Sequence, residues 1–65
     1  MPKAIIRTSV YPTGECISTG YYYDDKQTLK QWEYIGEFSD LDYSLYLMRE
    51  NEGCEIQHVV NRHIT

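Results

Sequence analysis

The chain has 65 residues and a formal net charge of −4 at pH 7. A chain of this length forms one domain and buries only about 60% of the surface that its unfolded form exposes, so its stability is small. No apolar run approaches the ~20 residues that a membrane-spanning helix needs, and the amino terminus lacks a signal-peptide pattern. The sequence therefore predicts a single domain over residues 1–65 that is cytoplasmic and does not enter a membrane.

The negative charge is concentrated in the middle of the chain. Residues 1–32 have nearly balanced charges, whereas residues 33–55 contain seven acidic side chains and one basic side chain, Arg49. Such a field repels phosphate backbones and membrane surfaces and favours a basic partner. Acidic side chains also keep small proteins soluble, so the charge alone leaves both a functional and a solubilising role open.

The first predicted element is a β-hairpin. Residues 3–10 are rich in β-branched side chains, and residues 15–23 form a second such run. The turn between them contains Pro12, which presets φ, and Gly14, which can adopt a positive φ. A glycine-containing turn between two β-rich runs is typical of a hairpin. The consecutive tyrosines at residues 21–23 must then place at least one ring on each face of the second strand.

A third strand is predicted over residues 29–36. Trp32 and Tyr34 would share one face of that strand, with Gln31 on the other. A short helix is the alternative, because Thr28 and Gln31 have the spacing of a capping box.

A helix is predicted to follow Ser39 and to end at Gly53. Ser39 is a good N-cap, Phe38 and Tyr43 have the spacing of a hydrophobic staple, and Gly53 can end the helix in the left-handed conformation. An alternating apolar pattern over residues 41–48 leaves a strand as the alternative. The start and stop signals favour the helix.

A last strand is predicted over residues 54–64, with Cys54, Ile56 and His58 on one face. The elements in chain order give β-β-β-α-β, an α+β domain with a small, mostly antiparallel four-stranded sheet and one helix packed across it. The alternative assignments give β-β-α-β-β.

The predicted helix carries more apolar side chains than a domain of this size can bury. Leu41, Leu45 and Met48, at i, i+4 and i+7, supply the stripe that packs on a sheet. Further apolar side chains project to the other sides, and these are Tyr43, Tyr46 and Leu47. Because a helix that is apolar nearly all round is ordinarily buried on more than one side, we expect a partner to cover part of it.

We expect this helix to provide a partner-binding surface, since tyrosine is enriched at interface hot spots. Its anchors would be Tyr43, Tyr46 and Leu47, ringed by Asp40, Asp42 and Glu50. The expected function is that of a small, acidic, non-enzymatic interaction module, an inhibitor or adaptor that binds a protein partner, and a basic nucleic-acid-handling protein is one candidate for that partner. A homodimeric accessory protein is an alternative that the same surface would satisfy.

No catalytic, cofactor or metal site is predicted. Cys54, His58 and His63 form C-x3-H-x4-H, but on a strand Cys54 and His58 would lie about 13 Å apart and His63 would face the other way, which fits tetrahedral zinc poorly. No local motif joins a nucleophile to a base and an orienting group. The four glycines are dispersed, and none opens a phosphate-cradling loop. Cys16 and Cys54 are expected to remain reduced thiols.

Three antiparallel strands followed by a helix, over residues 3–50, resemble the small three-stranded DNA-binding domains of some integrases and plant transcription factors. The resemblance implies a nucleic-acid-binding strand face lined by Lys3, Arg7, Lys26 and Lys30, with Tyr21, Tyr23 or Trp32 available for stacking. In size and charge the chain also looks like the small inhibitors that phages and mobile elements make against host defence or nucleic-acid enzymes. That likeness implies a nucleic-acid mimic, whose carboxylates take the place of phosphates.

Overall fold

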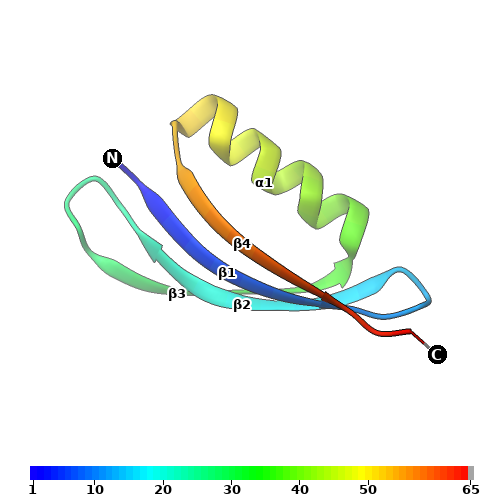
Figure 1. The fold of residues 1–65 in the computed structure, drawn as a ribbon. Helices are drawn as coiled ribbons and strands as arrows, with labels where there is room; N and C mark the ends of the chain where they lie inside the picture. The colour runs from blue at the N-terminus through cyan, green and yellow to red at the C-terminus, as the bar shows by residue number, and fades with distance from the viewer. Residues whose placement is uncertain (65) are drawn as a thin grey trace.

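The computed structural model describes residues 1–64 as four strands and one helix (Figure 1). In chain order these are β1 (Lys3–Val10), β2 (Glu15–Tyr23), β3 (Leu29–Glu37), α1 (Phe38–Glu52) and β4 (Glu55–Arg62). The predicted α+β class and the order β-β-β-α-β are confirmed. Both alternatives are wrong, because Thr28 leads into a strand and residues 41–48 are helical.

The sheet has the strand order β3-β2-β1-β4. The pairings of β1 with β2 and of β2 with β3 are antiparallel, whereas β4 lies parallel to β1. Parallel neighbours need a long crossover connection, and α1 provides it by carrying the chain from the β3 edge across the sheet to the far side of β1. The result is a mixed sheet in which β3 and β4 are the two edge strands.

The first hairpin turn forms as Pro12 and Gly14 predict, and a second turn joins β2 to β3. In the first, the backbone N–H of Gly14 donates to the Tyr11 carbonyl at 2.9 Å, and Gly14 has φ +92°. In the second, the Asp24 carboxylate accepts backbone hydrogen bonds from Thr28 at 2.9 Å and from Lys26 at 3.0 Å. The hydrogen bond from Thr28 has the largest effect on Asp24. Both bonds lower the pKa of this carboxyl group because they favour its charged form.

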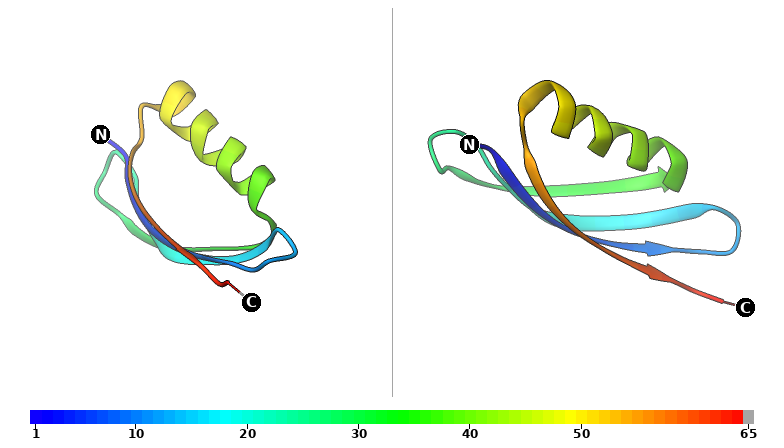
Figure 2. Two further views of the ribbon diagram at one scale, coloured as in Figure 1. Left: turned by 45° about the vertical axis from the view of Figure 1, so that its right-hand side comes forward. Right: turned by 45° about the horizontal axis from the view of Figure 1, so that its top comes forward.

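The sheet curves along its strands, and α1 lies on the concave side (Figures 1 and 2). The backbone of β1 occupies the space beside Gly20, in the middle of β2, where a side chain would begin. A Cβ at this position would clash with the backbone carbonyl of Ile5 and would lie 2.9 Å from the Cα of Ile6. Only glycine fits there without a backbone shift.

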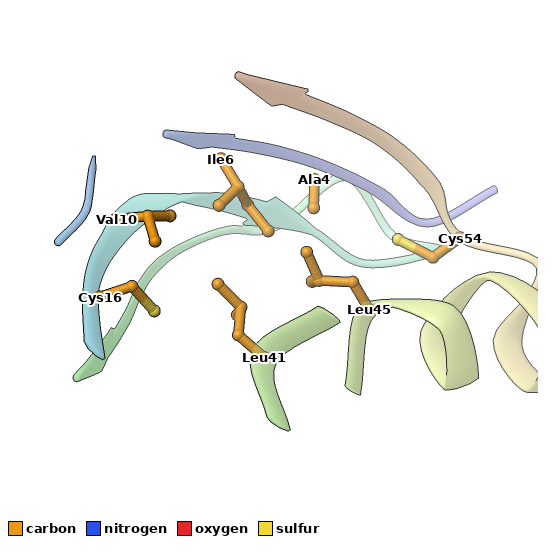
Figure 3. Close-up of a cluster of buried hydrophobic side chains, with 7 residues drawn as sticks. All are labelled: Ala4, Ile6, Val10, Cys16, Leu41, Leu45 and Cys54. Atoms are coloured by element: carbon orange, nitrogen blue, oxygen red, sulfur yellow. The ribbon is translucent and has the colours of Figure 1, made fainter. Parts of the chain in front are cut away.

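The core lies between the concave face of the sheet and α1. In Figure 3, Leu41 and Leu45 point from the helix toward Ile6 and Ala4 on β1. The buried apolar residues are Ala4, Ile6, Val10, Cys16, Leu41, Leu45 and Cys54. Each fully buried leucine contributes about 1.5–3 kcal/mol relative to an exposed one, so the predicted stripe of α1 holds the helix to the sheet.

Cys16 and Cys54 are free thiols inside this core. Burial raises the pKa of both thiols, because desolvation disfavours the thiolate. Both side chains therefore act as small apolar residues at neutral pH, in agreement with the expectation of reduced cysteines.

The start of the helix differs from the prediction. The N-cap residue is Glu37, with φ −71° and ψ 136°, and its side chain makes no capping hydrogen bond. Ser39 instead lies inside the first helical turn, so it is not the N-cap. Phe38 packs partly buried against the core whereas Tyr43 is exposed, so the predicted hydrophobic staple is also wrong.

The early start follows from how the strand and the helix join. The backbone N–H of Phe38 donates to the Gly14 carbonyl at 2.9 Å, which ties the junction to the β1–β2 turn. The Tyr34 hydroxyl donates to the Glu37 carbonyl at 3.1 Å. Because β3 remains paired through Glu37, the chain passes directly from strand to helix without the intervening residue that Ser39 would need as a cap.

The predicted end of the helix and the predicted bounds of the last strand are close to those observed. Gly53 adopts φ +62°, and the backbone N–H of Cys54 donates to the Met48 carbonyl at 3.2 Å, as expected for a glycine-terminated helix. The last strand is shorter than predicted, Glu55–Arg62 rather than residues 54–64. Within residues 1–64, no helix has the length and apolar character needed to cross a membrane.

Candidate protein-interaction surface

The outward side of α1 presents two exposed tyrosines. Because Leu41 and Leu45 face the sheet, residues on the opposite side of the helix point to solvent. Tyr43 and Tyr46 are 62% and 54% exposed, and their rings stack with centroids 6.3 Å apart and planes 20° apart. Residues three apart on a helix are neighbours, so the pair forms one continuous aromatic area.

Exposed carboxylates surround the tyrosine pair. Asp40, Asp42 and Glu50 are all exposed on α1, as the sequence predicts. The helix contains four acidic residues and one arginine, which gives it a net charge of −3 out of −4 for the whole chain. The structure therefore brings two of the three predicted anchors and the three predicted carboxylates onto one surface, which we call the tyrosine face: Asp40, Asp42, Tyr43, Tyr46 and Glu50.

Leu47 is the predicted anchor that fits this surface least well. Its side chain is half-buried, whereas Tyr43 and Tyr46 are exposed. It is not one of the partly buried side chains that pack against the core, which are Tyr22, Trp32, Tyr34, Phe38, Met48 and Ile56. Leu47 therefore lies at the border between the tyrosine face and the packed side of α1.

A second apolar surface lies on the side of the sheet that α1 does not cover. We call it the open sheet face, and it consists of the odd-numbered strand residues. Its exposed apolar members are Ile5, Ile17, Tyr21, Leu29, Ile35 and Val59. Ile17 pairs directly with Ile35 across β2 and β3, and Ile5 pairs with Tyr21 across β1 and β2, so these side chains form two apolar pairs on either side of the row that contains Thr19.

The open sheet face is not among the predicted surfaces, although the sequence carries a signal for it. The strands carry apolar residues at odd positions as well as even ones, whereas a half-buried antiparallel strand should alternate apolar with polar side chains. Ile35, at 74% exposure, shows the consequence most clearly. Exposed apolar side chains gathered on one face in this way mark interaction surfaces.

The middle of the open sheet face is hollowed. The hollow has a volume of about 540 Å³, and its lining includes Arg7 on β1, Thr19 on β2 and Glu33 on β3. These three residues occupy one row across the strands, because Arg7 pairs with Thr19 and Thr19 pairs with Glu33. Arg7 and Glu33 are thus two strand spacings apart, about 9.6 Å.

The predicted basic strand face does not form as a single surface. Lys3 and Arg7 share the open sheet face with Tyr21, because all three positions are odd. Lys30 and Trp32 are on the opposite side of the sheet, and the Lys30 ammonium lies 3.9 Å from the Asp24 carboxylate. The basic residues expected to contact nucleic acid together are therefore divided between two faces and the β2–β3 turn, which holds Lys26.

A hydrogen-bonded chain of polar side chains crosses the concave face under α1. Thr8 Oγ1 lies 2.6 Å from His58 Nε2 and 2.8 Å from Ser18 Oγ, and Ser18 Oγ donates to the Arg7 carbonyl at 3.2 Å. All three contacts are hydrogen bonds at once when Ser18 donates to that carbonyl, Thr8 donates to Ser18 and the His58 Nε2–H donates to Thr8.

Burial lowers the pKa of His58, and the nearby positive charge of Arg49 lowers it further, with Asp42 opposing. The imidazole is therefore neutral at pH 7. Thr8 is 2% exposed beneath the helix, so no substrate reaches its hydroxyl. This arrangement links β4, β1 and β2 structurally and does not provide an accessible nucleophile.

Among residues 1–64, no group of three or more histidine, cysteine, aspartate and glutamate side chains is placed to hold a metal ion. His63 stacks on Tyr11 with ring centroids 4.9 Å apart, at the end of the sheet where β1 turns into β2. Comparison of the chain with protein-family models, with curated proteins and with solved structures gives no match. Function is therefore inferred from the two exposed surfaces.

Proposed function

We propose that this protein is a non-enzymatic interaction module whose tyrosine face binds a basic protein. The observation that carries the proposal is the stacked pair of Tyr43 and Tyr46, more than half exposed and surrounded by Asp40, Asp42 and Glu50. A protein of this type would act as an inhibitor or adaptor by covering a surface of its partner.

The two tyrosines of the tyrosine face are well suited to anchor a partner. Tyrosine supplies a large apolar area with a polar tip at a low cost in conformational entropy, which is why it anchors interfaces. The two rings already stack on each other in the free protein, so little freedom is lost when a partner contacts them.

The charge of the tyrosine face selects the partner. Three carboxylates around two aromatic rings attract arginine and lysine side chains, and arginine also stacks on tyrosine faces. A groove that normally holds a nucleic-acid backbone has this basic character. A nucleic-acid-handling protein, for which the carboxylates take the place of phosphates, is therefore the partner class that we propose.

Affinity capture with matched variants tests the proposal. Wild-type protein and the Tyr43→Ala/Tyr46→Ala variant are used as baits in a lysate of the producing cells, with Tyr11→Ala as the control because it removes an exposed tyrosine outside α1. We expect a basic protein to be captured by wild type and by the control but lost with the double variant. Equal capture by all three baits would reject the tyrosine face.

The captured protein is then purified and its Kd is measured at two salt concentrations. Asp42→Asn/Glu50→Gln should weaken binding at least tenfold at low salt, whereas Glu15→Gln/Glu55→Gln, which removes the same charge from the open sheet face, should change the Kd less than threefold. Raising the salt should weaken wild-type binding, because screening shortens the reach of the acidic field. A Kd that does not depend on salt would rule out electrostatic mimicry.

A further inference from the structure

We propose that the open sheet face binds a second copy of this chain, in a symmetric dimer whose two-fold axis runs along β2. This inference does not rest on the proposed function, because it concerns the opposite side of the molecule from the tyrosine face. It is carried by the exposed apolar side chains of the sheet, by the pattern of charge across its strands and by the position of Thr19.

The exposed apolar side chains of the open sheet face need another surface to pack against. Ile17, Tyr21 and Ile35 are 44%, 47% and 74% exposed on a face that no other element of residues 1–64 packs against. In Figure 2, α1 lies on one side of the sheet in both views, and the other side is bare. A sheet with an apolar face is stabilised when that face packs on another layer. A 65-residue chain buries only a modest share of its surface by itself, so an added layer contributes strongly to its stability.

The charges on this face identify the covering surface as that of a second copy. Arg7 on β1 and Glu33 on β3 flank Thr19 on β2 in a single row. Neither charge has an ion-pair partner within residues 1–64, where the pairs formed are those of the amino terminus with Asp25 and of Lys30 with Asp24. Two opposite charges, symmetrically placed and unpaired, are what a self-complementary interface needs.

The geometry of a two-fold axis along β2 satisfies both charges at once. Such an axis exchanges the β1 side of one copy with the β3 side of the other, so Arg7 of each copy faces Glu33 of the other. Thr19 lies on the axis, and its small side chain lets the two sheets approach at the hollow. Ile17 and Tyr21, also on β2, then meet their own counterparts, which places the apolar contact at the centre of the interface.

A two-fold axis perpendicular to the strands would bring like charges together. It would place Arg7 opposite Arg7 and Glu33 opposite Glu33, which is repulsive. The row of Arg7, Thr19 and Glu33 therefore selects the axis along β2, although that axis leaves Glu15, at the start of β2, opposite its own counterpart. In that arrangement both α1 helices lie on the outside of the dimer, so each dimer would present two tyrosine faces, pointing away from each other.

Charge exchange tests this arrangement by sedimentation velocity over a range of protein concentrations. Wild type should dimerise. Arg7→Glu and Glu33→Arg should each raise the dimer Kd at least tenfold, because each places like charges opposite one another. An equimolar mixture of the two variants should form a heterodimer with near wild-type affinity, since both contacts are then complementary.

Two further variants separate the open sheet face from the helix and from loss of folding. Ile35→Glu should abolish the dimer while circular dichroism stays unchanged, because Ile35 is largely exposed in the single chain. Tyr43→Ala/Tyr46→Ala should leave the dimer intact. A wild-type monomer at millimolar concentration, a dimer insensitive to Ile35→Glu, or a mixture of charge variants that does not associate would each overturn the proposal.

Discussion

Thr8 joins three strands through one hydroxyl group, by accepting from His58 on β4 and donating to Ser18 on β2. The sequence predicts that His58 shares a strand face with Ile56, and the structure confirms that position. It could not predict the hydrogen bond, because Thr8 and His58 are 50 residues apart in the chain. The contact exists only because β4 lies beside β1, and no local pattern reports strand order.

Burial of His58 makes stability depend on pH. The pKa of His58 is lower in the folded protein than in the unfolded chain, so the unfolded chain binds more protons as the pH falls below about 6.5. The stabilising contribution of neutral His58 is therefore complete above that pH and is lost as the pH falls toward the folded pKa. We expect the urea midpoint to fall between pH 7.5 and pH 5.5, above the range in which carboxylates titrate.

His58→Gln should remove most of that pH dependence, because an amide can still donate to Thr8 but does not titrate. His63→Gln is the matched control, since His63 is an exposed ring that stacks on Tyr11, and it should retain the wild-type slope. A midpoint that falls equally in wild type and in His58→Gln would show that His58 is not responsible.

At the scale of the elements, the strands and the helix could be predicted because alternation and a three-to-four residue repeat are local signals. The first residue of α1 could not, because Ser39 has the chemistry of a cap while the position of the cap depends on where β3 stops pairing. β3 remains paired as far as Glu37, whose partner on β2 is Glu15. The next residue, Phe38, is bonded to Gly14 in the β1–β2 turn.

The uncapped start of α1 gives a test by substitution. Ser39→Ala should change the free energy of unfolding by less than about 0.5 kcal/mol, because Ser39 is an exposed residue within the first turn and not the N-cap. Glu37→Asp should stabilise the protein by about 0.5–1 kcal/mol, since the shorter carboxylate can reach a free backbone N–H without changing the charge. A loss of about 1 kcal/mol or more in Ser39→Ala, measured by urea unfolding, would restore Ser39 as the cap.

The close approach of the β1 backbone to Gly20 gives a second test at this scale. Gly20→Ala should cost about 3 kcal/mol or more in the free energy of unfolding, because the added methyl group meets the backbone of Ile5 and Ile6, which cannot move aside. Gly36→Ala is the control, also in a strand, where the methyl group meets the outer end of the Tyr34 side chain, its hydroxyl at 2.8 Å and its ring at 3.0 Å, rather than backbone, so a smaller cost is expected. Equal costs in the two variants would mean that β1 and β2 do not approach as described.

For the whole molecule, the sequence predicts the layers but not their exposed sides. The predicted tyrosine face forms because helical spacing alone places Tyr43 and Tyr46 together on α1. The open sheet face could not be assembled in advance, because it combines Ile5, Ile17 and Ile35 from three strands. The predicted basic face failed for the same reason, since Arg7 and Lys30 differ in strand parity and so lie on opposite sides of the sheet.

Two exposed surfaces on opposite sides give the molecule its proposed organisation, in which the sheet faces a second copy and the helix faces a partner. The helix also contains most of the net negative charge, −3 of −4. Attraction of a basic protein would therefore be directed to the outer sides of a dimer, away from the contact between the two sheets.

Site-specific photocrosslinking in the producing cells tests the tyrosine face most directly. The photoreactive residue p-benzoylphenylalanine replaces Tyr43 in one variant and, for comparison, Ile35 in another. We expect position 43 to crosslink to a different, basic protein, and position 35 to give a product of twice the 7.7 kDa chain mass. Position 43 crosslinking only to a second copy of the chain, or to nothing while position 35 captures the foreign protein, would contradict the assignment of α1 as the partner-binding surface.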